Sequence, residues 1–204
     1  MNIQWYGGGC FIIKGKRASI YINPTERSFR SASLKDNIVL STLVKVDEFK
    51  KSFNDQEILF IDQPGEYEKA GIFIYGLPVY NDKNYQMIYR IEMEDLNLVY
   101  LGNLNEKLSE EILEEFDGVN ILILPVGGDS VLEPKRAANL ASQIDATVII
   151  PCYYKTDDDK KSKFESIDKF LKESGYSSHK EISFTPKSKD FEGEESQVII
   201  LDKN

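Results

Sequence analysis

The chain has 204 residues, 41% of them hydrophobic and 11% aromatic, so it can bury a core of the size that one domain needs. We therefore expect a single domain over residues 1–204. An excess of 34 acidic over 25 basic residues gives a net charge of −9, which disfavours nucleic acid and anionic membranes as partners. No apolar run approaches the roughly 20 residues of a membrane span, and the first residues lack a basic start followed by an apolar segment. These features predict a cytoplasmic protein.

The two cysteines are far apart in the sequence, and each lies beside a predicted core strand. Cys10 precedes one such strand and Cys152 follows another. Free cysteine is among the residues most often buried. We expect two reduced, buried thiols.

The first half of the chain predicts strands. Residues 2–6, 10–14 and 17–22 are rich in β-branched and aromatic residues and are separated by glycine-containing turns, which is typical of an antiparallel meander that Asn23-Pro24 ends. Further strands are expected at 38–40, 57–61, 71–75, 85–93 and 98–101, with a turn at Asp62-Gln63-Pro64-Gly65. The second half adds helices. The spacing of Leu104, Leu108, Ile112, Leu113 and Phe116 predicts a helix whose glutamates form a solvated face.

The remaining helices and strands are predicted from the positions of prolines and glycines and from the spacing of apolar residues. A helix is expected to begin at Pro134, and a strand over 147–150 is expected to stop at Pro151. A helix containing Phe164, Ile167, Phe170 and Leu171 should end at Gly175, and two strands near 181–185 and 197–202 should flank a charged hairpin.

The segment from Val119 to Gly128, VNILILPVGG, is the organising strand of the chain. Its isoleucines and leucines are uninterrupted after Asn120, which is typical of a strand buried on both faces. Gly127 and Gly128 let the following turn adopt a positive φ or allow another group to approach closely. In a covered sheet such a turn is a usual place for a site.

A β-rich first half followed by alternating strands and helices indicates an α/β (α+β) fold of two packed sheets with helices outside. Several motifs extend along nearly the whole chain: Trp5-Tyr6-Gly7 with Cys10-Phe11, Asn23-Pro24, Ile38-Val39-Leu40 leading to Asp47, Pro64-Gly65-Glu66-Tyr67, Leu101-Gly102, Leu124-Pro125-Val126-Gly127-Gly128, and Ile150-Pro151 followed by Tyr154. Together they resemble the metallo-β-lactamase superfamily, in particular its small metal-dependent hydrolases similar to ascorbate-6-phosphate lactonase. The resemblance implies a four-layer αββα sandwich of two mainly antiparallel sheets.

The resemblance also shows what this chain lacks. Relatives hold zinc or manganese with a His-x-His-x-Asp-His run, a bridging aspartate and further histidines. Here Leu43, Lys45 and Glu48 stand at the three histidine positions of the run, and only Asp47 matches. At the other motif positions, Gly7-Gly8-Gly9 replaces Gly-His-Ser, Asn103 replaces the bridging aspartate, and Pro151-Cys152-Tyr153-Tyr154 replaces Pro-Met-His-Tyr. Asn81-Asp82 stands where many relatives have His-Asp.

The residue types themselves argue against a zinc catalyst. Such a site needs about three ligands from histidine, cysteine or carboxylates, and the chain has one histidine, His179, in a polar stretch where we expect it at the surface. A hard-ion site built from Asp47, Glu48, Asp82 and Asn103 is a chemical alternative for magnesium or manganese. Lys45 more naturally neutralises those acids as an ion pair. A Cys152 nucleophile lacks a motif histidine to generate its thiolate.

Two functions follow as alternatives. The first is a catalytically degenerate member of this fold that acts as a binding or assembly module, with no catalytic residue, no metal and no cofactor. Its vestigial cleft would be lined by Gly8, Leu43, Lys45, Asp47, Glu48, Asn103 and Tyr153. Its partner would be an unidentified protein or a second copy of the chain. The second is a hydrolase of small lactones or phosphoesters with a rebuilt site, in which Asp47 is a metal ligand or general base and Tyr153 or Lys45 stabilises an oxyanion.

Overall fold

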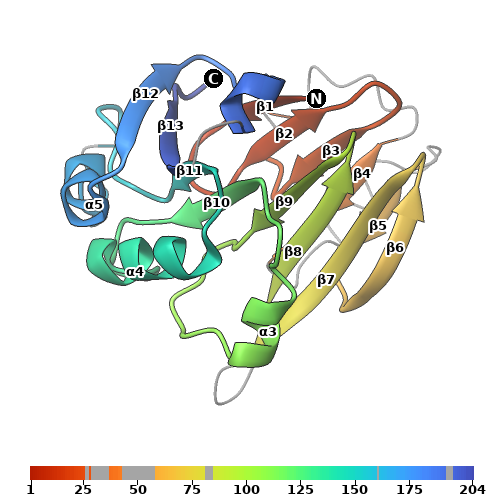
Figure 1. The fold of residues 1–204 in the computed structure, drawn as a ribbon, viewed down its shortest axis with the longest axis horizontal. Coiled ribbons are helices and arrows are strands. Elements are labelled where there is room, and N and C mark those ends of the chain that lie inside the picture. The colour runs from red at the N-terminus through yellow and green to blue at the C-terminus, as the bar shows by residue number, and fades with distance from the viewer. Residues whose placement is uncertain (26–27, 29–36, 43–57, 81–84, 160, 192–194) are drawn as a thin grey trace.

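Two β-sheets pack face to face in the computed structural model (Figure 1), which describes residues 1–25, 28, 37–42, 58–80, 85–159, 161–191 and 195–204. One sheet has five strands in the order β1-β2-β3-β4-β5, and the other has eight in the order β12-β13-β11-β10-β9-β8-β7-β6. Both sheets mix parallel and antiparallel pairs. The predicted two-sheet α/β sandwich is confirmed. The expectation that both sheets are mainly antiparallel is wrong: among the described strands, the eight-stranded sheet has four parallel and three antiparallel pairs, and the five-stranded sheet has two of each.

The five-stranded sheet begins with the expected meander. β1 (Asn2–Trp5), β2 (Phe11–Lys14) and β3 (Ser19–Ile22) pair antiparallel. β4 (Ile38–Leu40) and β5 (Leu59–Ile61) then add in parallel. The strands of this sheet lie close to the predicted ranges.

The eight-stranded sheet has an antiparallel half and a parallel half. β6 (Gly65–Lys69), β7 (Ile72–Tyr80), β8 (Tyr85–Met93) and β9 (Leu96–Tyr100) form an antiparallel meander. β10 (Ile121–Pro125), β11 (Val148–Cys152), β13 (Gln197–Leu201) and β12 (Ser177–Glu181) continue it in parallel. All five residues of β10 are buried, so the predicted doubly covered central strand is confirmed.

Helices lie beside the parallel half of this sheet. α4 (Pro134–Ile144) packs against β10 and α5 (Ile167–Ser174) packs against α4, while α3 (Glu110–Glu114) is a short helix (Figure 1). Pro134 occupies the first turn of α4, and Gly175 ends α5 in the left-handed conformation (φ 71°), both as predicted. A short 3₁₀ turn, η1 (Ser188–Phe191), precedes β13.

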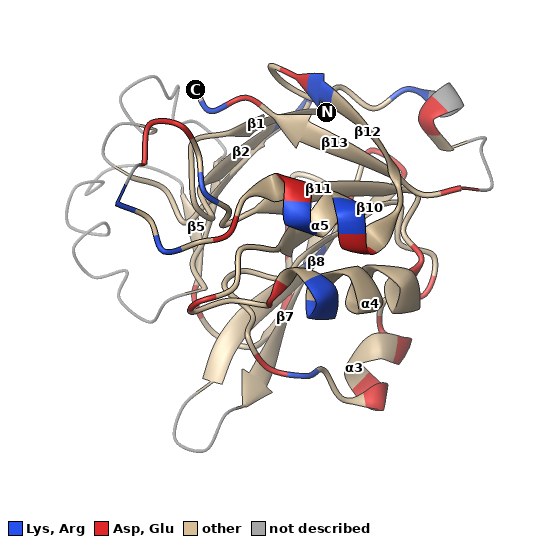
Figure 2. Ribbon diagram, turned by 90° about the vertical axis from the view of Figure 1, so that its left-hand side faces the viewer, with Lys and Arg blue, Asp and Glu red and all other residues tan. Residues whose placement is uncertain are grey.

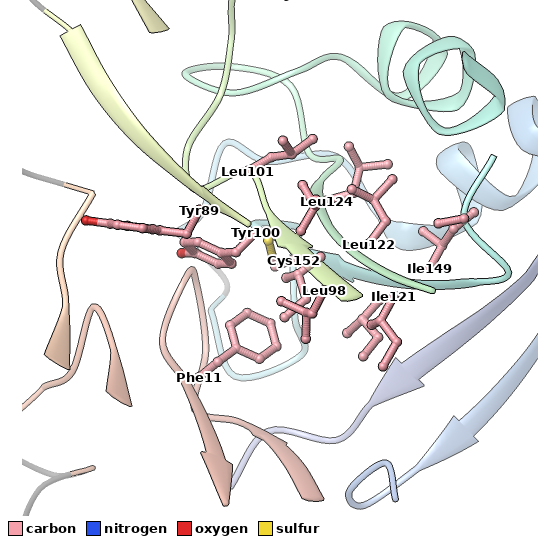
Figure 3. Packing of buried hydrophobic residues seen from close by; sticks show 14 of the residues in the cluster. Phe11, Tyr89, Leu98, Tyr100, Leu101, Ile121, Leu122, Leu124, Ile149 and Cys152 are labelled. Atoms are coloured by element: carbon pink, nitrogen blue, oxygen red, sulfur yellow. The ribbon is translucent and has the colours of Figure 1, made fainter. Parts of the chain in front are cut away.

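The main core fills the space between the sheets, and Figure 3 shows its centre. A smaller cluster of Ile12, Tyr21 and Val39 lies on the other face of the five-stranded sheet. These three residues are register partners on neighbouring strands, so they share one face. The expected helical layer over that face cannot be placed within the described residues.

Several expectations for individual elements are wrong or incomplete, and one of them is that Phe164 lies outside α5, whose N-cap residue is Ser166. The long helix over 104–116 is reduced to α3, because Ser109 caps a helix that begins at Glu110, its side chain accepting a hydrogen bond from the Ile112 amide. Leu104 and Leu108 are nevertheless buried, and the glutamates of α3, red in Figure 2, are exposed as predicted. The chain after the expected turn at Gly65 forms the additional edge strand β6.

The other two corrections concern the last parallel strands. β11 does not stop at Pro151 but continues to Cys152. Proline has no N–H to donate, but the pairing of β11 with β13 ends at Ile149, so no hydrogen bond between these two strands is lost at Pro151. β12 begins earlier than expected, at Ser177, and runs parallel to β13, so the two are not a hairpin. All five β12 residues are exposed, which is why no apolar period marked the strand.

Within the described residues, no helix has the length and apolar character to cross a bilayer. Cys10 and Cys152 are both free and buried, as predicted.

Tyr89 links the two sheets through its hydroxyl group. Its oxygen lies 2.5 Å from the Ser41 carbonyl oxygen and 3.0 Å from the Ile61 carbonyl oxygen, both on the five-stranded side. Tyr89→Phe should lower the free energy of unfolding by about 1–3 kcal/mol, because it leaves buried carbonyl groups without this donor. Tyr80→Phe, at a residue 71% exposed, is the matched control and should change it by less than about 0.5 kcal/mol in urea unfolding. Equal effects of the two variants would contradict this link.

Candidate functional site

The candidate site lies at one end of the sandwich, where the parallel strands of both sheets finish. Asn23 follows β3, Thr42 follows β4, Asn103 follows β9 and Tyr153 follows β11. The carboxyl ends of neighbouring parallel strands meet at one sheet edge, which is the usual position of sites in such folds. The glycine turn between β1 and β2, which contains Gly8, closes the same end.

The structure brings two of the predicted residues, Gly8 and Tyr153, into contact. The Gly8 carbonyl oxygen accepts a hydrogen bond from the Tyr153 amide at 3.4 Å and another from the indole nitrogen of Trp5 at 2.9 Å. Gly8 has a φ of 52° and Tyr153 a φ of 51°, so both adopt the left-handed conformation. For tyrosine this backbone is costly, and the surrounding contacts must hold it.

Glycines at positions 9 and 127 allow Tyr153 to pack so closely. A Cβ on Gly9 would lie 2.6 Å from the Tyr100 hydroxyl and would clash with the Tyr153 hydroxyl. A Cβ on Gly127 would overlap the Tyr153 carbonyl oxygen. Close approach at the Gly127-Gly128 turn was predicted from the sequence, and Gly128 has the expected positive φ of 69°.

A hydrogen-bonded network of neutral groups lies beneath this contact. The Tyr100 hydroxyl donates to the Gly9 carbonyl oxygen at 2.7 Å and accepts from the Asn23 amide nitrogen at 3.0 Å. The same amide nitrogen donates to the Thr42 hydroxyl at 2.8 Å, and the Thr42 amide donates back to the Asn23 side-chain oxygen at 2.9 Å. The network joins the ends of β3, β4 and β9 with the first glycine turn.

Thiols and aromatic rings complete this polar cluster. Figure 3 shows Cys152 beside Tyr100, with Phe11 on the side of the five-stranded sheet. The Phe11 and Tyr100 rings meet edge to face at 6.1 Å. Burial raises the pKa of the Cys152 thiol and of the Tyr100 hydroxyl well above their ordinary values. Burial also raises the pKa of Tyr153 and of Cys10.

Asn103 is placed differently from the other two described residues of the predicted cleft. It follows Gly102, at which a Cβ would lie 2.9 Å from the Thr42 side chain, so it borders the network. Its side-chain oxygen is buried and has no hydrogen-bond partner among the described residues. A buried acceptor without a partner is unfavourable by about 1–3 kcal/mol, and such groups in native proteins call for an explanation. Asn103 is therefore the position in this cluster best suited to receive a donor from a ligand.

The other predicted residues lie outside the part of the chain that the structure describes. These are Leu43, Lys45, Asp47, Glu48, Asn81 and Asp82. His179 lies on the edge strand β12 and is exposed, as expected for a surface residue.

The donors in the described part of the site do not fit a zinc centre. The side chains of the described network belong to Asn23, Thr42, Tyr100 and Tyr153, none of which is a usual zinc ligand. Among the described residues, no group of three or more histidines, cysteines or carboxylates is placed to hold a metal ion. The amide and hydroxyl groups of Asn23, Thr42 and Tyr100 instead pair with one another and with the Gly9 carbonyl oxygen.

Sequence reasoning missed Tyr100, Asn23 and Thr42 as parts of this site. Tyr100 was assigned to a core strand, although its hydroxyl at the strand end needed a buried partner. Asn23-Pro24 is a predicted strand end and motif, and Asn23, which is left-handed (φ 44°), donates its side-chain amide to the Tyr100 hydroxyl.

Comparisons with known proteins agree on the fold. The family model described as the beta-lactamase superfamily domain matches residues 2–153. A UPF0173 protein of Pyrococcus abyssi is 23% identical over 179 residues, covering 76% of this chain and 84% of that protein.

Two solved structures extend the comparison to three dimensions. One is a Thermotoga maritima protein classed as a zinc-dependent hydrolase of the metallo-β-lactamase superfamily, with a TM-score of 0.80 and 24% identity over 98% of this chain and 99% of that chain. The other is Igni18, a metallo hydrolase of Ignicoccus hospitalis, with a TM-score of 0.64 and 14% identity over 85% and 90% of the two chains. At these identities the likeness establishes the metallo-β-lactamase fold.

Gly9→Ala tests the packing of the tyrosine pair. The new methyl group would collide with both hydroxyls, and because Gly9 does not have a positive φ, the effect is steric. We expect a loss of about 1–3 kcal/mol in the free energy of unfolding. Adding Tyr153→Phe, which removes one colliding hydroxyl, should recover part of that loss in a double-mutant cycle. Additive effects would show that the two groups do not meet.

Alkaline pH tests the burial of Tyr100. Its folded-state pKa lies above the ordinary value of about 10, so above that pH the unfolded chain loses a proton that the folded chain keeps. The contribution of Tyr100 to stability is therefore fully present below about pH 10 and falls by about 1.4 kcal/mol per pH unit above it. Tyr100→Phe should make the decline between about pH 10 and 11 shallower by that amount in urea unfolding. Each protein's free energy of unfolding is taken relative to its own value at pH 7. An equal decline with pH in wild type and Tyr100→Phe would contradict the burial of the Tyr100 hydroxyl.

Proposed function

Because the chain belongs to the metallo-β-lactamase superfamily, we propose that it is a catalytically degenerate member that uses the ancestral cleft for binding or assembly. The observation that carries the proposal is the packing of Tyr153 and Tyr100 against Gly9, where neutral hydroxyl groups converge. The proposal includes three further points. The metal-binding motifs are degenerate, the chain is similar to the ascorbate-6-phosphate lactonase branch, and the protein is located in the cytoplasm.

The chemistry of the cluster supports binding over catalysis. A general acid or base works best with a pKa near the operating pH, whereas burial moves the pKa of Tyr100 and Tyr153 further from neutrality. Both hydroxyls lie among the hydrogen-bonding groups of the network. Asn103 offers the unpaired acceptor. A ligand with an N–H or O–H group would relieve that unpaired oxygen.

The sequence of the undescribed segment points in the same direction. Leu43 has no lone pair to give to a metal ion, and Lys45 would bring an ammonium group to the same place. Asp47 and Glu48 are the carboxylates that Lys45 would neutralise.

A hydrolase is the second candidate, and one comparison favours it. The Thermotoga maritima structure, classed as a zinc-dependent hydrolase, matches nearly all of this chain. In this alternative Asp47, Glu48, Asp82 and Asn103 would form a carboxylate-rich site for magnesium or manganese. Asp47 would be the ligand or base on which turnover depends.

A turnover assay separates the two candidates. Purified protein would be incubated with a small lactone and with a phosphodiester, each with added zinc, manganese or magnesium. We expect rates equal to those of Asp47→Ala and of the buffer with metal alone. Turnover by the wild type that Asp47→Ala abolishes, while circular dichroism shows both proteins folded, would refute degeneracy and establish the hydrolase.

A further inference from the structure

Three tight turns line one pocket at the end of the sandwich opposite the candidate site. They join β2 to β3, β6 to β7 and β8 to β9, whereas the candidate site lies where β3 and β9 finish (Figure 1). The pocket has a volume of about 650 Å³. Ligand pockets commonly have volumes of about 300–1,000 Å³, so this pocket has room for a small molecule.

Arg17 connects the two sheets at this pocket. It belongs to the β2–β3 turn, which the Gly15 amide closes by donating to the Ala18 carbonyl oxygen at 3.0 Å. A Cβ on Gly71, in the β6–β7 turn, would lie 3.3 Å from the Arg17 Nη1 atom, so the guanidinium group lies close to the Gly71 backbone. The Arg17 side chain is exposed and forms no ion pair with another described residue. Its charge is therefore available to a ligand.

The glutamates that line the pocket are already paired. The Glu94 carboxylate accepts hydrogen bonds from the Met1 amino group at 2.5 Å and from the Lys16 backbone amide at 2.7 Å. Glu92 forms an ion pair with Arg90 at 2.8 Å. Among the described lining residues, two cations and one carboxylate without an ion pair remain: Lys16, Arg17 and Asp95. The pocket is thus locally positive in a chain whose net charge is −9.

An exposed aromatic ring lines the same pocket. Phe73 is 47% exposed, although Ile72 and Ile74 on either side of it in β7 are buried. Successive strand residues point to opposite faces, and Ile74 belongs to the core, so Phe73 points to the outer face of the sheet. Ala70 and Leu96 add apolar surface to the lining. A ligand that covers Phe73 gains free energy from the burial of apolar surface.

We propose that this pocket binds a small aromatic carboxylate. The planar guanidinium group of Arg17 can donate two parallel hydrogen bonds to a carboxylate, and the ammonium group of Lys16 adds a second positive charge. The aromatic part of the ligand packs on Phe73. A ligand without a negative charge would leave the two cations unpaired, and one without a ring would leave Phe73 exposed. No lining residue belongs to the candidate site, so the inference does not depend on the proposed function.

An NMR titration of isotope-labelled protein with phenylpropionate tests the proposal. The amide signals of Gly71 and Asn97, which line the pocket, should shift and saturate with a Kd of about 1 mM or below. The signals of Gly8 and Asn103, at the candidate site, should not shift. Phenylpropionamide, which lacks the charge, and acetate, which lacks the ring, should bind at least about tenfold more weakly.

Three results of this titration would overturn the proposal. The first is the absence of a saturable shift at the pocket. The second is binding at the candidate site alone. The third is equal binding of the three compounds.

Arg17→Gln and Arg136→Gln separate a specific ion pair from an effect of net charge. Both arginines are exposed and each substitution removes one positive charge, but Arg136 lies on α4, outside the pocket. Arg17→Gln should raise the Kd of phenylpropionate at least about tenfold, and Arg136→Gln should change it less than about twofold. Phe73→Ala should raise it severalfold, because the ring contact is lost. An equal Kd for the two arginine variants, or for Phe73→Ala and wild type, would contradict the assigned contacts.

Discussion

The buried hydroxyl of Tyr100 is the constraint on which the candidate site depends. It lies at the end of a strand in the eight-stranded sheet, yet its partners belong to the first sheet: the Gly9 carbonyl oxygen and the Asn23 amide. A fully buried hydroxyl must be paired, because leaving it without a partner is unfavourable by about 1–3 kcal/mol. The pairing therefore fixes how the two sheets meet at this end, and it requires a glycine at position 9.

Tyr153 builds on that arrangement. Its ring packs over the same glycine turn, and its strained backbone is held by contacts with Gly8 and Gly127. Trp5 joins the same corner by donating to the Gly8 carbonyl oxygen and stacking on Tyr154 at 5.0 Å. The scaffold of the superfamily is thus retained around a polar cluster whose described members are neutral. The fold alone therefore does not establish the chemistry of the site.

Much of the fold could be predicted because the spacing of apolar residues and the positions of turn residues indicate helices and strands from the local sequence alone. The fully apolar run of β10 and the Gly175 cap of α5 were recognised directly. β12 was misplaced because Ser177 to Glu181 are polar on both faces, and pairing with β13 alone makes them a strand. The expected helix over 104–116 was too long because buried Leu104 and Leu108 mimic a helical stripe while packing from a loop.

The site was predictable in part. Motif positions indicated Gly8, Asn103 and Tyr153, and the structure brings Gly8 and Tyr153 together. Tyr100 and Asn23 could not be found from the sequence pattern, since their contact depends on the packing of two sheets from distant parts of the chain.

Elemental analysis of the purified protein, after expression with added zinc, manganese and iron, tests the central claim most directly. The account predicts far less than one equivalent of metal per chain, and one tightly held equivalent or more would contradict it.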